Sequence, residues 1–202
     1  MPHRTPHALW SVAVLLLGLA APQQAQACAC CSDPGQRSEV TQDFDEYTRG
    51  ELFNIQFAST ARLFSDTGFP DSVEGVQDPL DQDYKLNVIR KPKEWAFEFT
   101  DAQGRTGTLV FPLPKRFTQF DVDPHGLAQP AAPNGPSLYK EWRVHGLAKL
   151  GGTLSKEGNW AHARLVFQGQ GNSCTSATSF ESWSLSVLGK NIKFRFLGTT
   201  VR

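Results

Sequence analysis

Several common signatures of function are missing from this sequence of 202 residues. It contains no Gly-x-Ser-x-Gly elbow, no His-Glu-x-x-His motif, no phosphate-binding loop and no dinucleotide fingerprint. These absences disfavour the motif-bearing hydrolases, zinc proteases and nucleotide-dependent enzymes. An enzyme with an unrecognised site stays open as an alternative.

An excess of charge of one sign is also missing. Lys and Arg together number 20, and Asp and Glu together number 20. Removal of Arg4 with the signal segment described below leaves 19 basic residues against 20 acidic ones, a formal charge of −1. Because nucleic-acid binding depends on clustered Lys and Arg side chains, this balance argues against a nucleic-acid partner.

Only one long apolar run is present, and it lies near the start of the chain. Ala8–Ala21 is a run of 14 residues that follows Arg4 and precedes Ala25-Gln26-Ala27, the small-x-small pattern that signal peptidase accepts. The run is shorter than the roughly 20 residues that a membrane-spanning helix needs. We therefore expect residues 1–27 to be a cleaved signal peptide. The mature chain is expected to be exported to a bacterial periplasm or secreted, with no membrane span.

Cysteine is scarce and unevenly placed. The four cysteines are Cys28, Cys30, Cys31 and Cys174. Export implies an oxidising compartment in which disulfides persist, and a bridge inside the Cys28–Cys31 cluster is geometrically difficult. We therefore expect one disulfide from the cluster, through Cys30 or Cys31, to Cys174.

The remaining thiols leave more than one interpretation open. Cleavage after Ala27 would make Cys28 the first residue, as in bacterial lipoproteins, so a lipid anchor on Cys28 is one alternative. Another is a periplasmic soft-metal site for Cu(I) or Zn(II) formed by Cys28, Cys30 and Cys31, because thiolates favour these ions. No Cys-x-x-Cys is present to support a thioredoxin-type redox pair.

Helical patterns are rare in the sequence, whereas alternation of apolar and polar side chains is widespread. A period of two is typical of strands with one buried face. The clearest alternation predicts a C-terminal up-and-down meander with short, turn-rich connections, formed by Leu138–Leu150, Ala161–Gln168, Glu181–Leu188 and Ile192–Leu197. One inner surface is expected to bury Trp142, Leu165, Phe167, Trp183, Leu185, Phe194 and Phe196, with Arg143, Arg164, Lys193 and Arg195 outside.

Earlier segments show weaker versions of the same pattern. Further strands are expected at Glu51–Phe57, Ala58–Phe64, Tyr84–Ile89, Glu94–Thr100, Thr106–Leu113 and Phe117–Val122, and one short helix at Ser38–Tyr47. The total of about nine or ten strands predicts an all-β antiparallel barrel or barrel-like sandwich. We divide the mature chain into a Cys-containing segment, residues 28–50, and an antiparallel β domain, residues 51–202.

Three histidines remain after removal of the signal: His125, His145 and His162. A hairpin turn at Glu157-Gly158 would place His162 opposite Thr153. The two strand histidines would then lie about 27 Å apart at the usual strand rise. All three are therefore expected to be solvated side chains that share no metal.

The sequence favours an exported non-enzymatic β domain that binds a small hydrophobic ligand or a partner protein. Barrels of about eight strands can hold one small ligand, but side chains can also fill them. Two segments, Tyr139–Trp142 and Gln168–Asn172, stand out as distinctive without indicating an activity.

Overall fold

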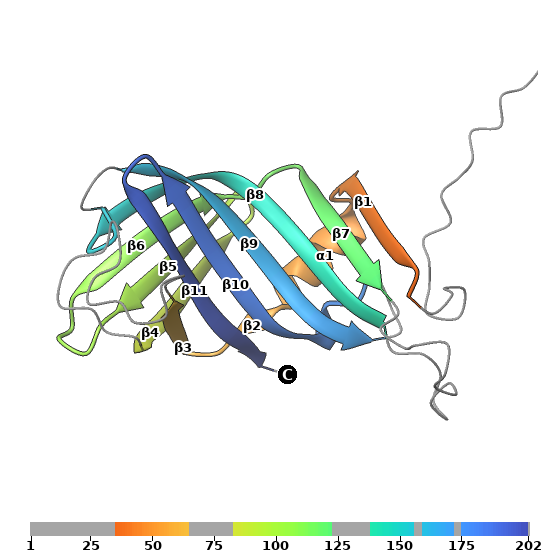
Figure 1. Cartoon of the computed structure of the whole chain (residues 1–202), viewed down its shortest axis with the longest axis horizontal. Helices are drawn as coiled ribbons and strands as arrows, with labels where there is room; N and C mark the ends of the chain where they lie inside the picture. Colours follow the sequence, from red (N-terminus) through yellow and green to blue (C-terminus); the bar gives the residue numbers. More distant parts are fainter. Residues whose placement is uncertain (1–34, 65–82, 123–137, 156–158, 172–174, 202) are drawn as a thin grey trace, which may run out of the picture.

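The computed structural model describes residues 35–64, 83–122, 138–155, 159–171 and 175–201, which form an antiparallel β-barrel (Figure 1). The first elements in chain order are β1 (Arg37–Asp43), α1 (Glu46–Asn54), β2 (Gln56–Phe57), β3 (Thr60–Phe64), β4 (Asp83–Lys91), β5 (Glu94–Thr100), β6 (Thr106–Pro112) and β7 (Arg116–Val122). They are followed by β8 (Leu138–Gly152), β9 (Trp160–Gly171), the short 3-10 helix η1 (Ala177–Ser179), β10 (Phe180–Gly189) and β11 (Ile192–Val201).

Eight strands close the barrel. Their order around it is β8-β6-β5-β4-β3-β11-β10-β9, and β9 returns to β8. Neighbours are antiparallel throughout, and β8 to β11 follow one another as a meander. The predicted all-β fold, its barrel closure and its C-terminal meander are therefore confirmed. Closure removes the exposed edges that an open sheet would present.

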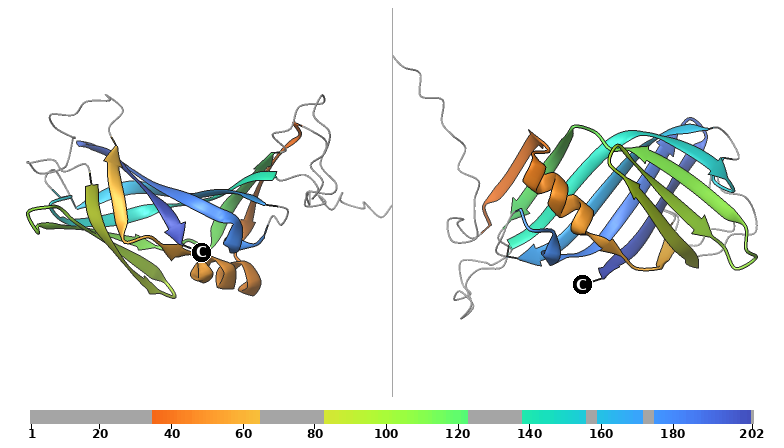
Figure 2. Two further views of the ribbon diagram at one scale, coloured as in Figure 1. Left: turned by 90° about the horizontal axis from the view of Figure 1, so that it is seen from below. Right: turned by 180° about the vertical axis from the view of Figure 1, so that it is seen from behind.

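β8 joins the barrel to an extension of the sheet. One edge of β8 pairs with β9 along most of its length. The other edge pairs with β7 over residues 139–143 and with β6 over residues 149–152. The sheet therefore forks beside the middle of β8, and β7 and β1 extend past the barrel (Figures 1 and 2).

α1 lies across the inner face of this extension, as Figure 2 shows from below and from behind. Asp45 caps the helix, because its carboxylate accepts the Thr48 N–H at 2.7 Å. The buried residues of the helix are Thr48 and Leu52, four positions apart as on one helix face. Among the described residues, no helix is long and apolar enough to cross a membrane.

Two predictions near the N-terminus are wrong. Ser38–Tyr47, predicted as a helix, is mostly β1, and Glu51–Phe57, predicted as a strand, begins with the end of α1. In the second segment, Phe53 lies near the end of α1 and Phe57 lies in the two-residue strand β2, and both are half-buried. Over so short a segment, the spacing of apolar residues does not distinguish a helix from a strand. The first segment is held as a strand by seven register pairs with β7, so tertiary pairing overrides local preference.

Aromatic side chains fill the barrel interior. Phe57 of β2 makes edge contacts with Trp95, Phe97, Phe167 and Trp183, with ring centroids 5.5–5.8 Å apart. Such contacts add to the stabilisation that comes from burying each ring. The predicted inner surface is confirmed, since each of its members is at most 4% exposed: Trp142, Leu165, Phe167, Trp183, Leu185, Phe194 and Phe196. The four basic residues predicted outside alternate with this set: Arg143, Arg164, Lys193 and Arg195.

Candidate functional site

The two histidines of the meander lie close together on the outer face of the barrel. His145 of β8 is the register partner of Arg164 of β9, and His162 of β9 is the partner of Leu147 of β8. They are diagonal neighbours, which places their Cα atoms about 7–8 Å apart in ordinary antiparallel geometry. The prediction of a separation of about 27 Å is therefore wrong.

The error comes from the connection between β8 and β9. β8 ends at Gly152, whose φ is +59°, and the chain then turns inward so that Leu154 is fully buried. The Ser155 N–H donates to the Gly152 carbonyl at 3.2 Å. These residues leave the ladder instead of pairing across a tight hairpin. The partner of His162 is consequently Leu147 and not Thr153, a shift of six positions along β8.

A hollow of about 440 Å³ opens on the outer face around these two histidines. Three adjacent strands line it: His145, Gly146 and Leu147 of β8, His162, Ala163 and Arg164 of β9, and Ser186 and Leu188 of β10. The short Ser186 side chain leaves space between its longer neighbours on this face, whereas Ala163 is buried on the inner face. We call this feature the outer hollow.

The outer hollow is cationic. Arg164 and two imidazoles line it, and its lining contains no carboxylate. Burial and the positive charges of Arg164 and Arg143 hold the pKa of His145 below its ordinary value. Desolvation and neighbouring cations both disfavour the imidazolium form, so the two causes act in the same direction.

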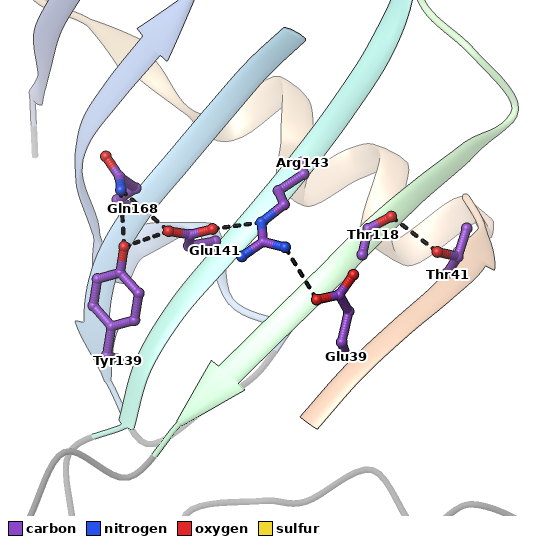
Figure 3. A network of polar contacts seen from close by, with 7 residues as sticks. All are labelled: Glu39, Thr41, Thr118, Tyr139, Glu141, Arg143 and Gln168. Atoms are coloured by element: carbon purple, nitrogen blue, oxygen red, sulfur yellow. Dashed lines mark hydrogen bonds and ion pairs between the residues drawn. The ribbon is translucent and has the colours of Figure 1, made fainter. Parts of the chain in front are cut away.

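A polar network lies next to the outer hollow on the same face (Figure 3). The guanidinium of Arg143 donates to Glu141 at 2.5 Å and to Glu39 at 3.2 Å. The Tyr139 hydroxyl donates to the other oxygen of Glu141 at 2.5 Å, and the Gln168 amide donates to the Tyr139 oxygen at 2.8 Å. The network therefore spans β9, β8 and β1.

The network shifts the pKa values of Tyr139 and Glu141 in opposite directions. Burial and the hydrogen bond to Glu141 raise the pKa of Tyr139 to about 12. Burial alone would raise the pKa of Glu141, but hydrogen bonds from Tyr139, Arg143 and Gln168 outweigh it and lower that pKa. Residues 139–141 and 168–170, from the two segments that stood out in the sequence, are thus strand partners, with Glu141 opposite Gln168.

A second polar cluster lies on the inner face of the same strands. Lys140 and Asp121 are register partners and are 0% and 4% exposed. One oxygen of Asp121 accepts from the Gln119 amide at 2.9 Å, and its other oxygen has no hydrogen-bond partner within the described ranges. Lys140 donates to the Ser176 carbonyl and lies 4.8 Å from the ring centroid of Phe180.

Sequence analysis missed this inner cluster. The available signal was the position of Lys140, which shares the inward face of β8 with Trp142 and Val144. A charged residue at such a position predicts a buried, partnered charge, because unpaired charges are rarely buried.

The residues predicted for the disulfide and the metal site lie outside the described residues. They are Cys28, Cys30, Cys31 and Cys174, and His125 lies outside as well. The bridge, the lipid anchor and the soft-metal site therefore stay predictions. Within the described ranges, no group of three or more His, Cys, Asp or Glu side chains is placed to hold a metal ion.

No family model, curated protein or solved structure matches the chain.

Proposed function

We propose that this protein is an exported, non-enzymatic binding domain that recognises its ligand on the outer face of β8, β9 and β10. The observation that carries the proposal is the contrast between the two sides of this sheet. Inward, Phe57 of β2 contacts buried aromatic rings of β5, β9 and β10. Outward, the same strands carry the outer hollow.

The packed aromatic side chains inside the barrel indicate that its interior stabilises the fold and does not bind the ligand. Trp95, Phe97, Phe167 and Trp183 are all at most 1% exposed. A barrel of eight strands is just wide enough for side chains to fill it. A hydrophobic ligand in the interior would have to displace rings that pack at interior density, which is costly.

The outer hollow, in contrast to the filled interior, has the properties of a ligand-binding site. It is concave, combines apolar with polar side chains, and is built on three hydrogen-bonded strands of a closed barrel. Sites on regular strands hold their side chains more rigidly than sites on loops. Adjacent to it, Arg143 is fixed by two carboxylates and lies 4.7 Å from the ring centroid of Phe120.

An NMR fragment screen of the mature protein tests this proposal. We expect amide shifts at positions 145–147, 162–164 and 186–188. Ser186→Phe should fill the outer hollow and abolish these shifts. Ser182→Phe is the matched control, since it places the same ring four residues earlier on the same face of β10, outside the lining. Shifts concentrated instead on the amides of Trp95, Phe97 and Trp183 would overturn the proposal in favour of an interior site.

Soft-metal binding by Cys28, Cys30 and Cys31 remains the alternative function. It rests on the sequence alone, because these residues lie outside the described ranges. Metal analysis of protein purified from the periplasm separates it from the binding function proposed above.

A further inference from the structure

The outer hollow lies on a cross-strand row that contains two arginines and a histidine. His145 of β8 is opposite Arg164 of β9, Arg164 is opposite Ser186 of β10, and Ser186 is opposite Arg195 of β11. Directly opposed like charges destabilise a sheet. Here the short Ser186 side chain separates the two arginines, and its hydroxyl accepts from the Arg195 guanidinium at 2.9 Å.

Three carboxylates on the outer face of β1 and β8 are already engaged. Asp43 pairs with Arg116 of β7 at 3.3 Å. Glu39 and Glu141 both bind Arg143. None of these three carboxylates lines the outer hollow.

The basic side chains of the outer hollow itself are not engaged in this way. Within the described part of the chain, Arg164, His145 and His162 make no hydrogen bond or ion pair through their side chains. Burial lowers the pKa of His145, and the positive charges of its neighbours Arg164 and Arg143 lower it further. A bound anion would offset this repulsion.

Apolar side chains flank the cationic centre. His162 is opposite Leu147 on one side and opposite Leu188 on the other. These leucines are 48% and 60% exposed, and both line the outer hollow. A single exposed leucine needs no explanation, but two that line one concave cationic site offer a surface for an apolar group.

We infer that the outer hollow binds a small organic anion, with a phosphate, sulfate or carboxylate group on Arg164 and the two histidines and an apolar group on Leu147 and Leu188. This inference rests on the proposed function, since it names the class of ligand for the same face. A guanidinium is suited to bidentate recognition of such groups. The anion can come from a soluble metabolite or from a lipid headgroup, and the test separates these sources.

The first probe is butyl sulfate, whose single charge does not change between pH 5 and pH 8. We expect it to shift the amides of His145, Leu147, His162 and Leu188 in NMR titrations. Butanol and butylammonium, which carry the same chain without the anion, should produce no comparable shifts. Inorganic sulfate should bind more weakly than butyl sulfate because it lacks the apolar group.

The key variant is Arg164→Gln. Charge-assisted hydrogen bonds contribute enough that we expect affinity for butyl sulfate to fall by about tenfold or more. Arg62→Gln is the matched control, because it removes the same charge from the outer face of β3, where Arg62 pairs with Asp83 at 3.4 Å. Butyl sulfate should also raise the pKa of His145 in the wild type and bind more tightly at pH 5.5 than at pH 8.

Two results would overturn the inference: affinity that is unchanged in Arg164→Gln, or equal shifts with butanol. If fragments perturb the outer hollow but butyl sulfate does not, the anion inference falls and the proposed binding function stands. If neither perturbs this face, both fall. When butyl sulfate binds, co-sedimentation with phosphatidylglycerol vesicles that depends on Arg164 assigns the site to a lipid headgroup. Binding of butyl sulfate without co-sedimentation assigns it to a soluble anion.

Discussion

Lys140 and Asp121 lie directly opposite each other on the inner face of β8 and β7, and both are buried. Lys140 binds the Ser176 carbonyl beside η1, and Asp121 binds Gln119 on its own strand. The pair therefore links the sheet extension to the segment that precedes β10. A buried charge that loses its partner destabilises the fold strongly. Substitutions of Lys140 and Asp121 should therefore have large effects on the free energy of unfolding.

The stability of Asp121→Asn relative to the wild type should depend on pH. Burial raises the pKa of Asp121, and the hydrogen bond from Gln119 and the charge of Lys140 offset only part of that increase. A carboxyl with a raised pKa in the folded state contributes stability that is present below its unfolded pKa and is lost as pH rises through the folded pKa. The neutral amide avoids this loss, so the stability of the variant should rise relative to that of the wild type as the pH increases above about 4. Urea unfolding across this range measures the difference, and a constant difference would contradict the prediction.

Lys140→Met should destabilise the fold strongly at neutral pH. The change keeps most of the apolar stem but leaves Asp121 buried without its positive neighbour, which typically costs about 3–5 kcal/mol. The control is Lys193→Met, an exposed lysine on β11, which should change stability by less than about 0.5 kcal/mol. In the double variant with Asp121→Asn, part of the loss should be recovered. Equal losses for Lys140→Met and Lys193→Met would show that Lys140 is not buried.

Phe194→Ala should cost about 3–5 kcal/mol of unfolding free energy, because the ring is 4% exposed and packs 5.7 Å from the ring centroid of Phe196. Leu188→Ala, at a position 60% exposed on β10, should cost less than about 1 kcal/mol. Chemical denaturation of the two variants measures this contrast. A cost near zero for Phe194→Ala would mean that the inner and outer faces of β11 are interchanged.

Tyr139 should ionise near pH 12. Its phenol is held in the neutral form by burial and by the hydrogen bond to Glu141. A raised tyrosine pKa contributes stability that is present below the unfolded pKa of about 10 and is lost as pH rises through the folded pKa. NMR titration of the ring carbons measures this pKa, with the Tyr139 signal assigned by its absence in Tyr139→Phe. Ionisation of Tyr139 near pH 10 in the folded protein would contradict the hydrogen bond.

Tyr139→Phe should also raise the pKa of Glu141, because one of the hydrogen bonds that lower it is lost. A lowered carboxyl pKa contributes stability above the unfolded pKa that is lost as pH falls through the folded pKa. The variant should therefore lose less stability than the wild type on acidification below about pH 4.5.

Cys174 should be bonded to Cys30 or Cys31 in protein taken from the periplasm. Arg37 of β1 and Gln170 of β9 lie in one cross-strand row, which passes through Val122 of β7 and Tyr139 of β8. Arg37 and Gln170 are therefore three strand spacings apart, or about 14 Å. Cys31 precedes Arg37 by six residues and Cys174 follows Gln170 by four, so the intervening chain is long enough to span this gap. Non-reducing peptide mapping decides the matter. A free Cys174 would contradict the bridge and favour the soft-metal alternative.

Sequence alone determined the strands of the meander and the inward set that includes Trp142, Phe167 and Trp183. Side chains alternate between the two faces of a strand, so the period of two assigns faces without knowledge of the partner strand. The aromatic content of the inward face left open whether side chains fill the barrel or line a ligand cavity, and this choice required the contacts of Phe57.

Only the tertiary structure decided which residues meet across the strands. The register of β8 against β9 depends on Leu154, whose burial takes the connection out of the ladder. That register brings His145, His162 and Arg164 into one hollow. The inner pair of Lys140 and Asp121 likewise depends on the fork that brings β7 beside β8. Pairing of distant segments is set by the summed packing of the whole barrel, and no local pattern of residues specifies it.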